Sequence, residues 1–365
     1  MSRLAGLLVL AALILGLLVL PWLVPLVMRQ TNSNNTEAGS QSAARKFHRI
    51  SKCAQWEPAS ADQMLQNLVA VNRTGMVAWN SWTAAENAAT VCLLDTKNLK
   101  NNAQDFRIQI HSGTKLVRMA LDDTGTLLAA LTSDGRVTYW DVRNRGAHQE
   151  PVPLHDSEFA VNILFDDRSK LWIVTARGGV YAHDFDAQRL QHITQMLDSK
   201  TLGTKIESFH AVTVVSDPAA QKIHVFQNYD LTQTLADGVD FALDPACQAL
   251  CVLAPDQVSV RVWAKHLTSS FEASASSSSA SAGSGPLTLD KDETLCGMVA
   301  NLGLATSVGR VYPVFQGRIS ATPIYVEDFP PSSPWKTTYL GHEKTLLVVD
   351  RNSSNFGAIE VFCVQ

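Results

Sequence analysis

A short pattern of three apolar segments separated by tight turns repeats along most of this 365-residue chain. The clearest copy runs from His111 to Asp141, where the turn sequences Asp-Asp-Thr-Gly and Ser-Asp-Gly separate the apolar runs. The first turns of the seven copies fall near Asn72, Asp122, Asp166, Gly203, Asp244, Asp290 and Gly341. Their mean spacing of about 45 residues is typical of an architecture that repeats one small antiparallel sheet.

Seven such copies predict an all-β, seven-bladed β-propeller over residues 47–365. A single three-stranded sheet cannot bury both of its faces, whereas radial packing covers each sheet with its neighbours. The chain ends just after the third strand of the last copy, so we expect the fourth strand of that blade to come from elsewhere. Phe47–Cys53 precedes the first copy and is the candidate closing strand.

This closure would place Cys53 and Cys363 on adjacent strands. We expect two unpaired thiols, as in a reducing compartment, and a disulfide between them is the alternative. The six cysteines include no Cys-x-x-Cys pair and have no neighbouring His at zinc-ligand spacing. No metal site is therefore predicted.

An almost wholly apolar segment from Leu4 to Met28 is long enough to span a bilayer. It exceeds the apolar core of a cleavable signal peptide, so residues 1–29 are predicted to be a transmembrane signal-anchor, with cleavage as the alternative. The polar residues 30–46 are predicted to form a flexible tether. The segment thus predicts a single-pass membrane protein, for example of the endoplasmic reticulum. The flanking basic residues favour an orientation with a cytosolic propeller. A bacterial inner-membrane protein with a periplasmic propeller is the alternative.

The clearest copy resembles the WD-repeat family. His111 matches the family's Gly-His position, Asp134 lies in the second turn, and Trp140-Asp141 matches the Trp-Asp dipeptide. The fifth copy matches in part, and the others match in strand pattern. The resemblance implies a structural tetrad that stabilises one blade through hydrogen bonds, formed by His111, Thr132, Asp134 and Trp140. These residues are therefore not interpreted as a catalytic triad.

In WD-repeat propellers, the loop between the second and third strands of a blade lies on the same face as the connection to the next blade. Three unusual loops of this chain belong to these classes: residues 83–89, the Ser-rich insertion 267–286 and residues 322–336. Large aromatic side chains are common anchors at protein interfaces. The resemblance therefore predicts a loop-rich, partner-binding face, directed away from the anchor, that carries Trp79, Trp82, Phe329 and Trp335.

No nucleophile elbow, phosphate-binding loop or zinc-protease helix occurs in the sequence, so we expect neither an enzyme nor a cofactor. A net charge of -4 without a basic stripe argues against nucleic-acid binding. The sequence predicts a membrane-anchored scaffold or adaptor that binds protein partners through its loop-rich face. Two alternatives stay open. One is an exchange factor or regulator of small GTPases in the secretory pathway, and the other is an exported propeller hydrolase or lectin.

Overall fold

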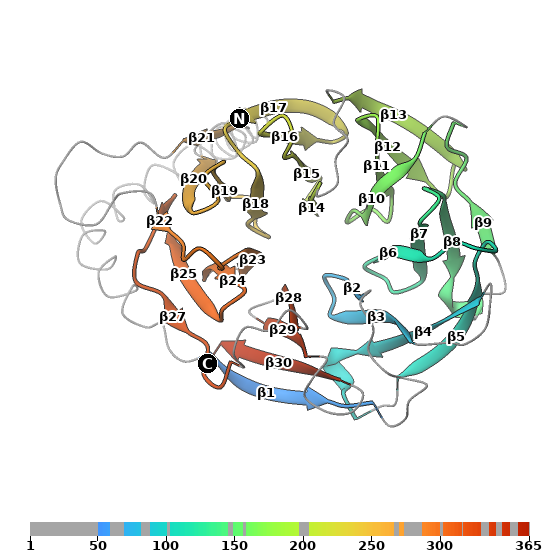
Figure 1. Ribbon diagram of the computed structural model, residues 1–365, viewed down its shortest axis with the longest axis horizontal. Helices are drawn as coiled ribbons and strands as arrows, with labels where there is room; N and C mark the ends of the chain where they lie inside the picture. Colours follow the sequence, from blue (N-terminus) through green and yellow to red (C-terminus); the bar gives the residue numbers. More distant parts are fainter. Residues whose placement is uncertain are drawn as a thin grey trace, which may run out of the picture. The chain divides into compact units, whose positions relative to one another are not determined.

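Seven antiparallel sheets are arranged around a common centre in the computed structural model (Figure 1). The structure describes residues 50–58, 69–81, 88–100, 103–144, 149–155, 158–196, 204–265, 270–273, 287–299, 302–315, 317–329, 336–340, 345–350 and 357–364. The predicted signal-anchor 1–29 and tether 30–46 lie outside these residues. Within the described ranges, no helix is long and apolar enough to cross a membrane.

Each blade is a sheet whose strands follow one another from the centre outward. Blade one contains β2 (Val69–Val71), β3 (Met76–Ser81), β4 (Ala88–Asp95) and β5 (Gln104–Gln109). Blade two contains β6 (Leu116–Leu121), β7 (Leu127–Thr132), β8 (Val137–Asp141) and β9 (Gln149–Pro151). Blade three contains β10 (Ala160–Phe165), β11 (Leu171–Thr175), β12 (Gly179–Asp184) and β13 (Arg189–Gln195). Short 3-10 turns, η2 (Thr96–Asn98) and η3 (Val142–Asn144), follow β4 and β8.

Blades four to seven follow the same plan, except that blades five and six each contain a fifth strand. Blade four contains β14 (Ile206–Phe209), β15 (Val212–Asp217), β16 (Lys222–Gln227) and β17 (Asp230–Ala236). Blade five contains β18 (Asp240–Leu243), β19 (Ala249–Leu253), β20 (Ser259–Lys265), β21 (Phe271–Ala273) and β22 (Leu287–Thr288). Blade six contains β23 (Leu295–Val299), β24 (Gly303–Thr306), β25 (Arg310–Phe315), β26 (Arg318–Ile319) and β27 (Ile324–Tyr325). Blade seven contains β28 (Lys336–Leu340), β29 (Thr345–Asp350), β30 (Ala358–Val364) and β1 (Ile50–Trp56).

Burial changes with the position of a strand in its blade. The second strands β11 and β19 are buried at every residue because neighbouring blades cover both of their faces. Their sequences, LWIVT and ALCVL, are accordingly continuous apolar runs. The outer strand β5 alternates between exposed and buried residues over its last four positions because only one of its faces is covered.

Polar side chains fix the tight turns within a blade. In blade two, the Asp122 carboxylate accepts hydrogen bonds from the backbone N–H groups of Thr126 and Leu127, both at 2.8 Å. Gly125 completes this turn at a φ of 68°, a left-handed conformation that residues with a side chain rarely adopt. The Asp-Asp-Thr-Gly signal in the sequence thus predicts the turn for a physical reason.

Strand β1 closes the ring, as predicted. It pairs antiparallel with β30, so the start of the propeller supplies the fourth strand of its last blade (Figure 1). An ion pair of 2.9 Å between Lys52 and Glu360 also joins the two strands. Cys53 and Cys363 form a disulfide, contrary to the expectation of two unpaired thiols. The bond is compatible with the local geometry because the two Cα atoms lie 5.9 Å apart on paired strands.

The predicted Ser-rich insertion interrupts a strand instead of separating two blades. Strand β21 pairs with Trp263–Lys265 at one end of β20, and β22 pairs with Ser259–Val260 at its other end. Residues 274–286 between these two strands lie outside the described ranges. The described residues of the insertion belong to the outer strand of blade five, and the prediction that the insertion decorates the loop-rich face mainly concerns residues outside those ranges.

The predicted repeat boundaries are displaced in two blades. In blade four the first turn is the two-residue turn His210-Ala211, not the region of Gly203. In blade six, Asp290 precedes the innermost strand, and the first turn lies between β23 and β24. Neither true turn carries an Asp-Gly signal, so the sequence pattern pointed to the nearest polar segment instead.

The two ends of the blades define two faces of the propeller. We call the upper face the one with the turns between second and third strands and the connections between blades. The lower face carries the other turns. On the lower face, a belt of contacts links successive blades: Asn72 Nδ2 donates to the Asp122 carbonyl at 2.7 Å, and Ser169 Oγ donates to the Asp122 carboxylate at 3.1 Å.

This lower-face belt also extends to more distant blades. Arg73 in blade one forms an ion pair with Asp123 in blade two, and its Nη1 donates to the Ser208 carbonyl of blade four at 3.1 Å. In blade five, the Cys247 thiol donates to the Phe209 carbonyl at 3.0 Å. Lower-face turns of blades one to five are therefore connected by side chains.

Candidate functional site

The predicted aromatic anchors do not form an exposed group among the described residues. Trp79 is fully buried, with its ring centroid 5.1 Å from that of Trp56 in the core between blades one and seven. Phe329 is half-buried and packs on Phe362 at a centroid distance of 5.9 Å. Trp79 is therefore not available to a partner, because it belongs to a strand that is covered on both faces. Trp82 and Trp335 lie outside the described residues.

Only one contact of the predicted tetrad is present. The Thr132 hydroxyl donates to the Asp134 carboxylate at 2.6 Å. His111 is exposed, because it begins a turn in which the backbone N–H and the hydroxyl of Thr114 both donate to its carbonyl. Trp140 is buried, and its Nε1 has no hydrogen-bond partner among the described residues. The prediction of a closed four-residue network in blade two is thus wrong for His111 and Trp140.

A comparable network, which the sequence pattern did not predict, occurs in blade six. Glu293 is buried and accepts hydrogen bonds from the hydroxyls of Thr306 and Tyr312 and from Arg310 Nη1 at 3.1 Å. In blade three, Glu158 lies beside Tyr181, and burial together with this carboxylate raises the pKa of Tyr181. A Thr followed six residues later by a Tyr was the signal in both blades, at Thr175 and Thr306.

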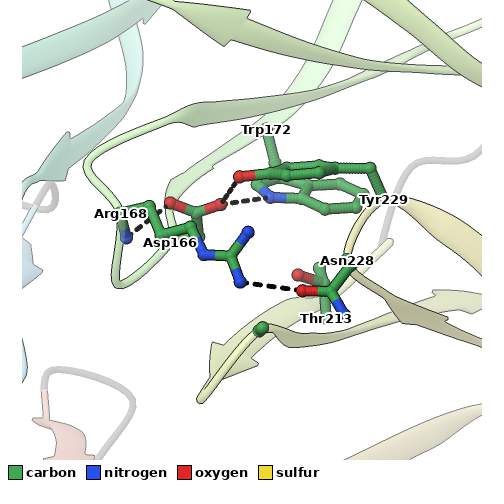
Figure 2. A pocket seen from close by; sticks show the side chains of 7 residues that line it. Asp166, Arg168, Trp172, Thr213, Asn228 and Tyr229 are labelled. Carbon is green, nitrogen blue, oxygen red and sulfur yellow. Dashed lines mark hydrogen bonds between the residues drawn. The ribbon is translucent and has the colours of Figure 1, made fainter.

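A small cleft opens on the lower face between blades three and four (Figure 2). The Asp166 carboxylate accepts hydrogen bonds from the Tyr229 hydroxyl at 2.8 Å and from Trp172 Nε1 at 3.1 Å. The two rings stack, with centroids 5.5 Å apart and an interplanar angle of 19°. Arg168 reaches across to Asn228 at 2.7 Å, so the cleft joins the two blades through polar contacts.

The polar groups of this cleft hold the two blades together and do not form a catalytic site. The other oxygen of Asp166 accepts from the backbone N–H groups of Arg168 and Lys170, so the carboxylate is fully engaged and is unsuited to act as a general base. Burial, with the Asp166 hydrogen bond, raises the pKa of Tyr229, which therefore stays protonated. The cleft volume of about 160 Å³, open solvent included, is smaller than a typical small-molecule site of about 300 Å³ or more. This cleft is therefore not a candidate sugar or substrate site.

The upper face of blades two and three presents an exposed aromatic side chain. Phe159 is 54% exposed and lies just before β10, in the connection between these blades. Its carbonyl accepts a hydrogen bond from Ala176 N–H at 2.8 Å, and the next residue, Ala160, donates to the Gly135 carbonyl at 3.0 Å. The backbone that carries the phenylalanine is therefore attached to the second-to-third-strand turns of both blades.

A bulge in strand β6 brings further side chains to this junction. The register between β6 and β7 shifts between Leu116 and Arg118, and the extra residue, Val117, is 48% exposed. Bulges commonly redirect side chains at sheet ends in this way. Arg118 is exposed and donates from Nη1 to Asn162 of β10, which links the bulge to blade three.

Three more cations lie on or directly beside the turns that hold Phe159. Lys115 exchanges hydrogen bonds with Ser133 at the turn of blade two, Arg136 follows Gly135 in the same turn, and Arg177 follows Ala176 in the turn of blade three. All three are exposed. We define the Phe159 patch by the following residues: Lys115, Val117, Arg118, Arg136, Phe159 and Arg177.

The sequence analysis missed this patch because Phe159 stands in a short connection that carries no motif. Phe159 also packs against Gly135 of blade two. A Cβ atom at Gly135 would lie 2.8 Å from the Cβ and 2.9 Å from the Cδ1 of Phe159. The only available signal was a phenylalanine next to a polar segment between two copies of the repeat.

Comparisons with known proteins address the fold. No family model and no curated protein matches the sequence. A chain in the crystal structure of the mitotic checkpoint complex gives a TM-score of 0.56 at 12% identity, covering 88% of this chain and 93% of its own. The Cps50 (Swd1) β-propeller domain of Myceliophteria thermophila gives 0.55 at 10% identity, covering 87% of this chain and 100% of that domain. Similarity at this level of identity shows the architecture alone, and the chain therefore has a WD40-like β-propeller fold.

Proposed function

We propose that this chain is a protein-interaction scaffold that binds its partners through the upper face of blades two and three. The observation that carries the proposal is Phe159, an aromatic side chain 54% exposed on a backbone that is hydrogen-bonded to turns carrying Arg136 and Arg177. Aromatic and arginine side chains are the residues most often found at binding hot spots. The fold is in keeping with this role, since one similar chain belongs to the mitotic checkpoint complex.

Site-specific photo-crosslinking tests this proposal. A photo-reactive phenylalanine analogue is placed at position 159 of the full chain and, as the control, at position 315. Phe315 is a matched residue because it is also exposed, at 62%, but lies on the third strand of blade six. We expect an adduct at position 159 but not at 315. The adduct's protein, once identified and purified, should bind the purified chain. Adducts that are absent, or identical at both positions, would contradict the proposal.

We further propose that the apolar segment 4–28 attaches this scaffold to a membrane. The length and apolar character of the segment support the attachment. The expected outcome is that the full chain stays with the membrane fraction after alkaline extraction, whereas a variant lacking residues 1–29 is released. Release of the full chain by the same treatment would contradict the proposed membrane attachment.

The Cys53–Cys363 disulfide bears on the side of the membrane that the propeller faces. Stable disulfides are rare in reducing compartments, so the bond supports a lumenal or periplasmic propeller over a cytosolic one. Protease treatment of sealed vesicles decides between the two locations. Protection until detergent is added, with both cysteines resistant to alkylation before reduction, is expected for the oxidising side. Digestion without detergent would establish the cytosolic side.

A further inference from the structure

We propose that the Phe159 patch binds an acidic peptide segment of another protein, with an apolar side chain of that segment packed against Phe159. This inference rests on the proposed function and names the chemistry of its partner. The patch combines an apolar centre with an excess of positive charge. Both features limit the kind of ligand that can bind there.

The apolar centre is held in place before any partner arrives. Gly135 has a φ of 76° and no side chain, so the Phe159 ring occupies the space that a Cβ would fill. Backbone hydrogen bonds from Ala176 N–H to the Phe159 carbonyl and from Ala160 N–H to the Gly135 carbonyl fix the peptide unit that follows Phe159. A rigid aromatic side chain loses little conformational freedom on binding, which favours its use as an anchor. Val117, 48% exposed at the bulge of β6, adds apolar surface.

The charge around this centre is unbalanced. Lys115 and Arg177 have exposed side chains that form no ion pair with any described carboxylate. Arg136 pairs with Asp134 at 3.3 Å, yet 65% of its side chain stays exposed. Arg118 is exposed and points one guanidinium nitrogen at Asn162. Among the described residues, the patch therefore offers Lys115, Arg177 and the exposed part of Arg136 to an anionic ligand.

Of the neighbouring carboxylates, Asp134 accepts the Thr132 hydroxyl at 2.6 Å. Glu158 lies beside Tyr181, and burial together with this carboxylate raises the pKa of Tyr181. Burial raises the pKa of Asp134, but hydrogen bonds from Thr132 and from the Arg136 backbone outweigh it, so its pKa lies below the usual value. Lys115 and Arg177 thus have no carboxylate partner among the described residues, and Asp134 is committed to Thr132 and Arg136. The whole chain carries a net charge of -4, so the patch is opposite in sign to the molecule around it.

An acidic peptide fits both features better than other anionic partners. Its carboxylates complement the cations, which accelerates encounter and excludes basic partners. An apolar side chain beside the carboxylates would cover the exposed ring, a contact that the phosphate backbone of a nucleic acid does not provide. The experiment must therefore distinguish the binding of a nucleic acid from the binding of a peptide.

Fluorescence anisotropy with the full chain in detergent tests the inference. The probe is the labelled peptide Gly-Asp-Glu-Leu-Glu-Asp-Gly, and the control peptide has Ser in place of Leu. We expect saturable binding of the Leu peptide that is weakened about tenfold or more by Phe159→Ala and also by the double substitution Lys115→Glu with Arg177→Glu. Phe315→Ala, at a matched exposed residue, should change the affinity less than about twofold. Unchanged thermal unfolding confirms that each variant is folded.

The outcomes separate this inference from the proposed function. Absence of binding by the Leu peptide, together with an adduct at position 159, would overturn the acidic partner and leave the scaffold role intact. Equal binding of the Leu and Ser peptides would overturn the role of Phe159. A single-stranded oligonucleotide that binds more tightly than the Leu peptide, with the same dependence on Phe159, would replace the peptide by nucleic acid. Failure of both the adduct and the binding would remove both proposals.

Discussion

At the scale of single residues, the buried histidines make the propeller sensitive to acid. His183 in β12 is 1% exposed and packs against Tyr139 and Phe185, at centroid distances of 5.9 and 4.6 Å. Burial lowers its pKa, although the carboxylates of Asp184 and Glu150 act in the opposite direction. His224 is also buried, and burial lowers its pKa as well. Both side chains are therefore kept neutral in the folded chain.

Stability should consequently fall on acidification, and His183→Gln should reduce that fall. The unfolded chain has a histidine pKa of about 6.5, above the folded value, so below that pH the unfolded state binds more protons and the free energy of unfolding decreases. Urea unfolding at about pH 7.5 and about pH 5.5 measures the difference. The variant should lose less stability than the parent between these two conditions, even if it is less stable at both.

The control for this measurement is His192→Gln, because His192 is exposed on the outer strand β13. It should lose as much stability on acidification as the parent. If the parent and His183→Gln lose the same free energy of unfolding between the two pH values, the buried imidazole does not determine the acid sensitivity.

At the scale of elements, the outer strand of blade five is divided but keeps its register. Ala273 pairs with Trp263, and Leu287 pairs with Val260, on the same strand β20. Only Arg261 and Val262 lie between these two paired positions of β20. Two residues would therefore suffice to join β21 to β22 as one continuous strand.

Replacing residues 274–286 by two threonines should thus preserve blade five and raise the free energy of unfolding by about 1 kcal/mol. The gain comes from closing a shorter loop, whose entropy cost grows only slowly with length. Urea denaturation of the full chain measures it. As a control, inserting the same two threonines after Ala273 without the deletion should not stabilise. A loss of more than about 2 kcal/mol on replacement would mean that the removed segment packs on the blade.

The elements also show where sequence reasoning succeeds. Turns that carry their own chemistry, such as Asp122 with Gly125, were predicted correctly because local hydrogen bonds determine them. The His210-Ala211 turn was missed because two residues without a turn signal adopt φ angles of 46° and 63° there. The Phe159 patch could not be predicted, since it requires a bulge and a glycine-containing turn of blade two to meet the segment that leads into blade three. Such coincidences depend on packing rather than on local pattern.

At the scale of the whole molecule, the lower-face belt connects blades that are far apart in the sequence. Arg73 contributes most to this connection, because one guanidinium contacts Asp123 of blade two and Ser208 of blade four. It also lies over the ring of Phe209, 5.7 Å from its centroid. Blade one is therefore held to blade four by a side chain as well as through the intervening sheets.

Arg73→Met should lower the free energy of unfolding by about 1–3 kcal/mol, because it leaves Asp123 without its cation and removes the donor to the Ser208 carbonyl. Hydrogen exchange should accelerate at the β14–β15 turn, more than a hundred residues away in the sequence. Arg107→Met, at an exposed residue of β5, is the control and should change stability by less than about 0.5 kcal/mol. Equal effects of the two substitutions would show that the belt does not stabilise the ring.

The closing strand has a consequence for how the chain is made. Cys53 and Cys363 are separated by 310 residues, so β1 leaves the ribosome long before its partner β30 exists. At about 5–20 residues per second, this interval is about 15–60 seconds. During that time the newborn strand has an open edge that other chains could pair with. Biosynthesis of this propeller should therefore depend on a chaperone that shields β1 until translation ends.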